Sequence, residues 1–427
     1  MPRQKTTPSE QVKEGETRRF ALKREAILDA AARLFNQKGV RGATLSAVAQ
    51  AVDLIPNSVT YYYRKKEDLA AACFLRATET LDGLVAAAEK ESDPPHALAA
   101  LFQGYADLLA RIARGETAEL VLFNDIRALP QPHGDTVFAA YTNLFRHVRA
   151  LVDAPGLSRP EANGRAHLVL SMLHNVRTLK DRYEPDDYGV AAARVVDILV
   201  NGLAAPGQTW PDSRLAPEPV HPSADASAEA FLRAATELIN EQGYRGASVE
   251  RISALLNVTK GSFYHHNDNK DDLVAQCFAR TFEVVRSRQN EARALEGSGW
   301  MRLCAAAEAL TRRQLGPEGP LLRQTAMSAL PETMREEVVA TMARLSGRFA
   351  MFIVDGMVDG SIRPVDSSIA AQCVNSTINA AAALARWAPG ANAANAADLL
   401  IRPLLLGLYP RGQAERRPRR AATKARG

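Results

Sequence analysis

Two short segments of the sequence carry hydroxyl, amide and cationic side chains at corresponding positions, 204 residues apart. The first segment holds Pro56, Asn57, Ser58, Thr60, Tyr61 and Tyr62, and the second holds Thr259, Lys260, Gly261, Ser262, Tyr264 and His265. An asparagine amide can pair with N6 and N7 of adenine, a lysine can reach O6 and N7 of guanine, and the apolar surface of a proline can contact a thymine methyl group. Hydroxyl and lysine side chains also bind phosphate. These residue types therefore allow recognition of nucleic acid.

Residue patterns for other chemistry are missing from the sequence. It has no phosphate-binding loop, no nucleophile elbow and no recognisable pair of catalytic carboxylates. Its four cysteines are Cys73, Cys277, Cys304 and Cys373. None belongs to a CxxC pair or has a histidine at metal-ligand spacing, so we expect buried packing thiols. The neighbours His265 and His266 would not face each other on a helix. We expect no enzyme activity, no cofactor and no metal.

An internal repeat gives the two segments equivalent surroundings. The sequence from Ile27 aligns without a gap with the sequence from Phe231, at a constant offset of 204. Identical pairs include Leu28/Leu232, Ala30/Ala234, Gly39/Gly243, Arg41/Arg245, Ser58/Ser262, Lys66/Lys270 and Cys73/Cys277. Chance does not give this many ungapped matches, so the sequence indicates a duplicated module.

Each copy of the module has the pattern of four helices. In the first copy, apolar residues recur at helical spacing before Gly39, which is placed to end the first helix. Thr44 can cap a second helix, and Asp53 tolerates the left-handed conformation of a tight turn. Pro56 suits the first turn of a third helix, and a fourth opens near Lys66 with acidic residues in its first turn. Two short helices packed on a longer one form a helix-turn-helix.

On these residues the second copy, GYRGASVERISALLNVTKGSFYHHNDNKDDL, resembles the N-terminal domain of the TetR/AcrR family. It departs from the family pattern at Asn267, where the family has phenylalanine. The first copy is similar but divergent: Pro56 and Asn57 replace Lys-Gly, and Thr60 stands where the family usually has tyrosine. The resemblance implies a DNA-binding regulator of transcription that binds double-stranded operator DNA with the third helix in the major groove.

The resemblance also implies which residues contact DNA. The expected set is Thr44, Ser46, Pro56, Asn57, Ser58, Thr60, Tyr61, Tyr62, Lys66, Ser248, Thr259, Lys260, Gly261, Ser262, Tyr264, His265 and Lys270. Among these, Thr44, Ser248, Lys66 and Lys270 are expected phosphate contacts, which fix register rather than sequence.

Charge separates the two modules. Residues 18–76 hold eleven Lys and Arg against five Asp and Glu, a net of +6, whereas residues 222–280 hold six against eight, a net of −2. Because phosphate neutralisation supplies most non-specific affinity, we expect the first module to dominate salt-dependent binding and the operator to be an imperfect palindrome. Residues 411–427 carry a net charge of +6, and the whole chain carries a net charge of +5. This basic tail either contacts DNA phosphates or only solubilises the chain.

Composition and pattern predict an all-α fold. The resemblance implies two tandem TetR-like units, each a three-helix helix-turn-helix domain followed by a helical ligand-binding and dimerisation domain. The expected segments are a disordered basic arm (1–20), helix-turn-helix domain 1 (21–81), regulatory domain 1 (82–205), a Pro-rich linker (206–224), helix-turn-helix domain 2 (225–285), regulatory domain 2 (286–409) and a disordered basic tail (410–427). Within the first regulatory domain, His147, His174 and Arg177 are candidates to orient a ligand.

By resemblance, the regulatory domains provide an effector pocket and a dimer interface, and a small lipophilic effector is an implied partner. The alternative for most of their apolar residues is plain core. The last two long helices of each half, expected near 162–182, 187–204, 366–388 and 393–408, would form a four-helix bundle. That bundle closes either within one chain, as a pseudo-dimer, or between chains of a homodimer.

The leading hypothesis is therefore a repressor that is relieved by a small-molecule effector. A constitutive or architectural DNA-binding protein without an effector, and an activator, stay open as alternatives. The sequence has no run of about 18 uninterrupted apolar residues and no apolar signal region at its N-terminus. We expect no membrane contact and a cytoplasmic protein.

Overall fold

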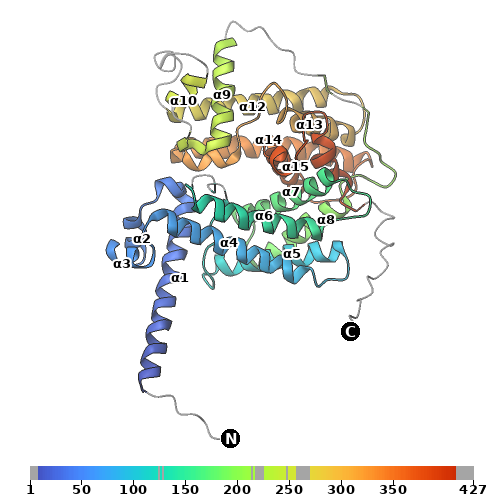
Figure 1. The fold of residues 1–427 in the computed structure, drawn as a ribbon. Coiled ribbons are helices and arrows are strands. Elements are labelled where there is room, and N and C mark those ends of the chain that lie inside the picture. The colour runs from blue at the N-terminus through green and yellow to red at the C-terminus, as the bar shows by residue number, and fades with distance from the viewer. Residues whose placement is uncertain are drawn as a thin grey trace.

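The computed structural model describes residues 8–409, except 124–125, 127–128, 213–214, 217–225, 247–248 and 256–269. In these ranges the regular elements are helices, with one isolated bridge between Ala204 and Ile362 (Figure 1). The all-α prediction is confirmed. Among the described residues, no helix is both long and apolar enough to cross a membrane.

The helices of the two halves follow each other in a similar order. The first half contains α1 (Pro8–Gly42), α2 (Leu45–Ala51), α3 (Pro56–Tyr62), α4 (Lys66–Ala88), α5 (Pro94–Ala113), α6 (His133–Leu151), α7 (Arg159–Val176), η2 (Arg177–Asp181), η3 (Pro185–Asp187) and α8 (Tyr188–Asn201). The second contains α9 (Ala226–Gly246), α10 (Val249–Leu255), α12 (Lys270–Ala294), α13 (Gly299–Arg313), η4 (Gln324–Ala329), α14 (Glu332–Val358), α15 (Ser367–Ala381), α16 (Leu384–Trp387), η5 (Ala397–Ile401) and α17 (Arg402–Leu406).

From Pro8 onward the N-terminal arm is helical, which corrects the expectation of disorder over 1–20 for residues 8–20. Helix α1 begins at Pro8, and its N-terminal part projects away from the rest of the chain (Figure 1). The segment is rich in Glu, Gln, Lys and Arg, which have high helix propensity, so a low apolar content does not prevent it from continuing the helix that packs from Ile27 onward. Residues 1–7 and the tail 410–427 lie outside the described residues.

The local predictions for the first module are confirmed. Gly39 interrupts α1 with a φ of 67°, and Asp53 has a φ of 53° in the turn between α2 and α3. The Thr44 hydroxyl accepts a hydrogen bond from the backbone N–H of Ala47 and so caps α2. Helix α3 begins at Pro56, and α4 begins with two acids in its first turn.

The four cysteine thiols are buried, as predicted, and two of them repeat the same contact. The Cys73 thiol donates to the carbonyl of Leu28 at 3.6 Å, and the Cys277 thiol donates to that of Leu232 at 3.7 Å. Burial raises the pKa of Cys73 to about 12 and that of Cys277 to about 11. Both thiols therefore stay protonated at neutral pH and serve packing.

The duplication continues beyond the helix-turn-helix modules, at an offset of 201. Residues 128–130 and 329–331 both read Ala-Leu-Pro, and the buried Leu129 and Val137 correspond to the buried Leu330 and Val338. In each half, these residues belong to the same apolar cluster as the helix-turn-helix module. The segment before α6, and its counterpart before α14, thus joins the module to the helices behind it.

The two halves share one apolar core. Helix α7 packs against α15 and η5, and α8 packs against α15 and α17. A single cluster of buried side chains, including Phe102, Leu173, Phe352 and Leu404, extends through both halves. At this junction the buried His167 ring nitrogen Nε2 lies 2.9 Å from the carbonyl oxygen of Ala380. The expected four-helix bundle thus forms within one chain, with shorter helices than the sequence predicts.

The Pro-rich linker contacts the second half where it is described. The indole N–H of Trp210 donates to a Glu308 carboxylate oxygen at 2.9 Å, and the guanidinium of Arg402 lies 4.8 Å from the Trp210 ring centroid. Leu215 is buried. This part of the connection packs on the surface of α13 and is not a free tether.

Candidate nucleic-acid interface

Helix α3 has one buried face and one exposed face. Val59 is fully buried and Tyr63 is nearly so, and these residues join α3, which packs on α2, to the apolar cluster that includes residues of α1 and α4. On the opposite face Pro56 and Asn57 are exposed, and 76% of Tyr61 is accessible to solvent. The sequence produces this separation because apolar residues stand at positions 59 and 63, four apart, and polar or aromatic residues stand between them.

The predicted contact residues of the first module come from three adjacent elements. Thr44 and Ser46 are exposed at the start of α2, the residues from Pro56 to Tyr62 form α3, and Lys66 begins α4. Ser58, Thr60 and Tyr62 are partly buried, and the Thr60 hydroxyl donates to the carbonyl of Asn57 at 2.9 Å. The Lys66 ammonium donates to the carbonyl of Arg41 at 3.2 Å, which links the start of α4 to the end of α1.

Two residues of α1 extend this surface, although no sequence motif singled them out. The Phe20 ring lies 4.7 Å from the Tyr62 ring and 6.1 Å from the Tyr61 ring, measured between centroids. Lys23 shares a shallow cavity of about 340 Å³ with Asn57 and neighbouring residues of α3. A signal for Phe20 was present, because it precedes Ile27 by two helical turns and so falls on the packed side of α1.

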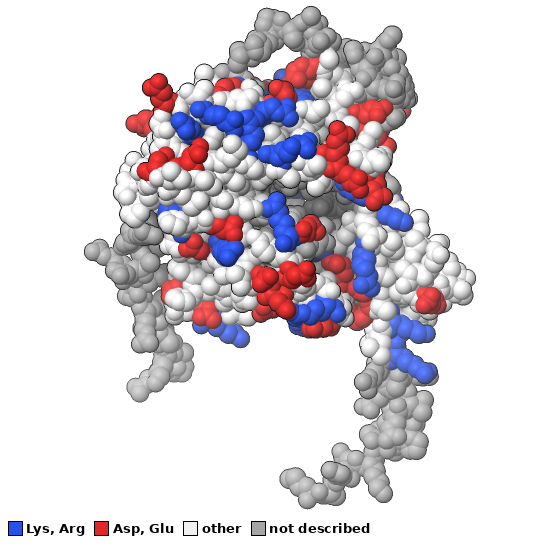
Figure 2. Space-filling view, turned by 180° about the vertical axis from the view of Figure 1, so that it is seen from behind, with Lys and Arg blue, Asp and Glu red and all other residues white. Residues whose placement is uncertain are grey.

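Exposed basic side chains surround this surface. They are Arg19, Lys23, Arg24, Arg41, Arg64 and Lys65. In the rear view, Lys and Arg lie on the described part of the projecting helix, whereas the broad face of the body mixes both signs of charge (Figure 2). A positive rim around an exposed helix is the electrostatic arrangement that attracts a polyanionic duplex.

Most predicted contact residues of the second module lie outside the described residues. These are Ser248, Thr259, Lys260, Gly261, Ser262, Tyr264 and His265. Lys270 is described and stands, partly buried, at the start of α12. The rest of this module repeats the first, because α9, α10 and α12 enclose an apolar cluster that contains Phe231, Ile252 and Phe278.

An asparagine of each module holds the segment behind it. The Asn36 amide donates to the carbonyl of Leu120 at 2.9 Å and accepts from the backbone N–H of Leu122 at 2.8 Å. In the second half, the Asn240 amide donates to the carbonyl of Leu321 and accepts from the backbone N–H of Arg323, both at 2.9 Å. This asparagine clamp fixes the first helix of each module to the chain that precedes α6 or α14.

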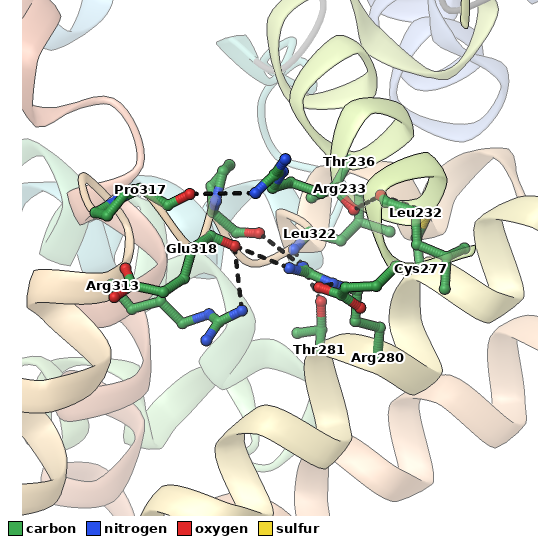
Figure 3. A network of polar contacts seen from close by, with 12 residues as sticks. Leu232, Arg233, Thr236, Cys277, Arg280, Thr281, Arg313, Pro317, Glu318 and Leu322 are labelled. Atoms are coloured by element: carbon green, nitrogen blue, oxygen red, sulfur yellow. Dashed lines mark hydrogen bonds and ion pairs between the residues drawn. The ribbon is translucent and has the colours of Figure 1, made fainter. Parts of the chain in front are cut away.

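An arginine reinforces the clamp in each half. Arg76 pairs with Glu25 at 3.1 Å and donates to the carbonyl of Glu119 at 2.8 Å. Its counterpart Arg280 pairs with Glu229 at 2.7 Å and donates to the carbonyls of Pro320 and Glu318 (Figure 3). The backbone N–H of Leu322 also donates to the Thr281 hydroxyl at 2.9 Å. Residues 318–323 are therefore bonded to both α9 and α12.

The clamped segment of the second half forms part of the wall of a cavity of about 430 Å³. Helices α12, α14 and α15 supply most of the lining, and Gln314, which follows α13, adds to it. Gln324 and Met327 come from η4, and Asn175, Thr178 and Asp181 come from α7 and η2 of the first half. His147, His174 and Arg177, the ligand-orienting candidates from the sequence, are not among its lining residues. Instead, His147 pairs with Asp82 on the surface at 2.6 Å, and Arg177 pairs with Glu119.

Comparison with known proteins gives two family matches and one curated relative. The model for bacterial regulatory proteins of the tetR family matches residues 27–73 and 231–277. The Transposon Tn10 TetC protein of Escherichia coli is 40% identical over 57 residues, which are 13% of this chain and 29% of that protein. The family model thus matches the helix-turn-helix part of each half, and this chain spans less than a third of the length of the curated relative.

Similar solved structures include two with 20% sequence identity. One is a TetR family transcriptional regulator, PfmR from Thermus thermophilus, with a TM-score of 0.31 over 40% of this chain and 95% of that chain. The other is apo AibR, with a TM-score of 0.34 over 40% of this chain and 93% of that chain.

Proposed function

We propose that this chain, a tetR-family protein that carries the family's N-terminal domain twice, represses transcription by binding operator DNA and releases it when a small molecule occupies the cavity of the second half. The exposed outer face of α3, with its basic rim, is the observation that carries the DNA-binding part of the proposal. Operator DNA of a bacterium lies in the cytoplasm, so the proposal includes that location.

In this proposal α3 lies in the major groove. Asn57 and Tyr61, which are exposed on its outer face, contact base edges, and the Asn57 amide suits adenine. Thr44 and Ser46 at the N-terminus of α2 contact the phosphate backbone, since backbone N–H groups at a helix start and nearby hydroxyls favour anions. Lys23 and Phe20 extend the contact along the duplex from α1.

The asparagine and arginine clamps supply a route from the cavity to the DNA. A ligand in the cavity contacts Leu321, Leu322 and Gln324, which belong to or adjoin the segment that Asn240 and Arg280 hold. A ligand that fits one position of this segment better than another changes the orientation of α9 relative to α14. The affinity for DNA then changes by the ratio of the ligand's affinities for the two arrangements.

Because the bundle closes within the chain, we propose that one chain binds one operator with two unlike halves. The first module brings the greater positive charge, and the second brings the nearly complete family pattern in its third helix. The half-sites then differ in sequence, because Asn57 of the first module corresponds to Gly261 of the second.

Selection of bound duplexes from a random double-stranded library, with the mass of the complex measured in parallel, tests this proposal. The expected result is a motif with two unlike halves, bound by one chain. Asn57→Ala and Tyr61→Ala should weaken binding by about 1–3 kcal/mol each and relax the sequence preference at one half-site. Val190→Ala is the matched control, because Val190 is exposed on α8, away from α3. Two like halves bound by two chains would contradict the single-chain arrangement, and equal loss in the control would contradict the role of α3.

A further inference from the structure

The two halves differ at the positions that surround the cavity. At the offset of 201, four cavity-lining residues of the second half correspond to four aromatic residues of the first half. Gln324 corresponds to Phe123, Val339 to Phe138, Met342 to Tyr141, and Ser346 to Phe145. The Ala-Leu-Pro match and the clamp contacts both follow this register. The first half therefore has larger side chains at each of these positions.

These aromatic side chains pack together in the first half, around a tryptophan from the second. The Trp387 ring stacks on Phe145 with centroids 4.7 Å apart and on Phe138 at 5.8 Å, and it lies 5.4 Å from Tyr141. Phe123 lies 4.9 Å from Tyr141 and so continues the cluster. Aromatic rings in mutual contact therefore occupy the positions that line the cavity in the second half.

The cavity of the second half receives smaller side chains from the partner half. The segment that follows α15 contributes Trp387 to the aromatic cluster of the first half. The segment that follows α7 contributes Thr178 at the cavity of the second half. Asp181 and Arg182 also line it, but both are exposed, and the Arg182 guanidinium donates to the Ser368 hydroxyl at 2.6 Å. The remaining lining residues are uncharged.

Among the described residues, the side-chain amide donor of Asn175 is a buried group of the cavity wall without a hydrogen-bond partner. Asn175 is 5% exposed, and its side-chain oxygen accepts a hydrogen bond from the Ser376 hydroxyl at 2.9 Å. Its side-chain nitrogen, Nδ2, has no hydrogen-bond partner in the described part of the chain. A buried amide donor without a partner costs about 1–3 kcal/mol. A ligand with an acceptor oxygen at this point would remove that cost.

We propose that each chain binds one small molecule, in the second half only, and that the molecule is uncharged and largely apolar with a carbonyl, ether or hydroxyl oxygen facing Asn175. A charged ligand is disfavoured because the interior of the cavity offers no counter-ion among the described residues. This inference rests on the proposed function, because the bound molecule is an effector only if the chain regulates transcription. A symmetric regulator would instead bind one ligand in each half.

Titration of the full chain with Nile red, an uncharged apolar dye that has a carbonyl group, tests the site. We expect one saturable site per chain, reported by the dye's emission, and no competition from the anionic dye 8-anilinonaphthalene-1-sulfonate. Ser346→Phe places the first-half residue in the cavity and should weaken binding at least tenfold. Ser346→Ala leaves the space open and should bind as the unmodified chain does. Asn175→Ala should weaken binding about three- to tenfold, the value of one hydrogen bond.

Circular dichroism and a thermal melt establish whether each variant is folded. If Ser346→Phe is not folded, Met342→Tyr, one helical turn away, fills the cavity in its place. Two equivalent sites per chain, unchanged binding in the folded filled variants, or no Nile red binding would each overturn the proposal. DNA binding of the same chains is measured without dye. A chain that binds one dye but no DNA refutes the proposed function and leaves the site intact, whereas DNA binding with two dye sites refutes the site alone.

Discussion

Gly164 on α7 offers a direct test of the junction between the halves. A Cβ atom at this position would overlap the backbone carbonyl oxygen of Leu399 in the second half, and a backbone group cannot rotate away. Forcing an extra carbon into a packed core costs about 1–3 kcal/mol, and the rigid neighbour places Gly164→Ala at the upper end of that range. Alanine recovers about 1 kcal/mol through its helix propensity, so we expect a net loss of about 2 kcal/mol.

Two other helical glycines provide matched controls. Gly83 on α4 and Gly347 on α14 are exposed, and a Cβ atom at either one meets no atom within 4 Å. Alanine at these positions gains helix propensity without a clash, so Gly83→Ala and Gly347→Ala should raise the free energy of unfolding by about 0.5–1 kcal/mol.

Thermal unfolding of the three variants, each beside the unmodified chain, measures the difference. About 2 kcal/mol corresponds to a fall in Tm of roughly 2–6 °C for a cooperative unit of this size. The controls should melt at or above the temperature of the unmodified chain. If Gly164→Ala melted with the controls, α7 would not approach η5 as closely as the structure has it, and the single-chain bundle would lose its main support.

Three further outcomes follow from contacts described above. Asn240→Ala removes two hydrogen bonds, so it should cost about 2 kcal/mol of stability. It should also reduce the effect of Nile red on DNA affinity more than it reduces dye binding. If Nile red changed the DNA affinity of this variant as it does that of the unmodified chain, the clamp would not connect the cavity to the DNA-binding surface. Burial lowers the pKa of His167 to about 4, below its usual 6.5, so the unfolded chain binds the extra proton between these values. Stability should therefore rise by up to about 3 kcal/mol from pH 4 to pH 6.5, and a pH series of melts should show a flatter rise for His167→Gln. Lys66→Ala should reduce the slope of log binding constant against log salt concentration by about one, which is more than Lys270→Ala does. Equal reductions in the two variants would refute the difference in charge contribution between the modules.

Local rules predict the helix-turn-helix module well. The start of α3 at Pro56, the cap at Thr44, the left-handed Asp53 and the stop at Gly39 each depend on the conformational preference of one residue in its immediate neighbourhood. Such preferences are readable in a sequence because they need no knowledge of distant partners.

The cavity could not be predicted in the same way. Ser346 of the second half and Phe145 of the first half occupy equivalent positions, and the smaller side chain leaves the space open. Both positions become interior only after the two halves pack together, which a sequence does not show. His147 illustrates the difficulty: as a polar residue among aromatics it was a reasonable ligand candidate, yet it pairs with Asp82 on the surface. A register at the offset of 201 would have exposed the contrast between the halves, and the clamp contacts were needed to establish that register.

The shared core of α7, α8, α15 and α17 has a consequence for how much of this protein a cell would need. Two separate subunits must find each other, so the concentration of the DNA-binding form falls as the square of copy number when copies are scarce. A tethered pair assembles at any copy number. In a homodimer each substitution also appears on both sides of the symmetry axis. In the proposed single-chain assembly a change such as serine to phenylalanine at position 346 occurs once, so each half is free to acquire its own ligand and its own half-site.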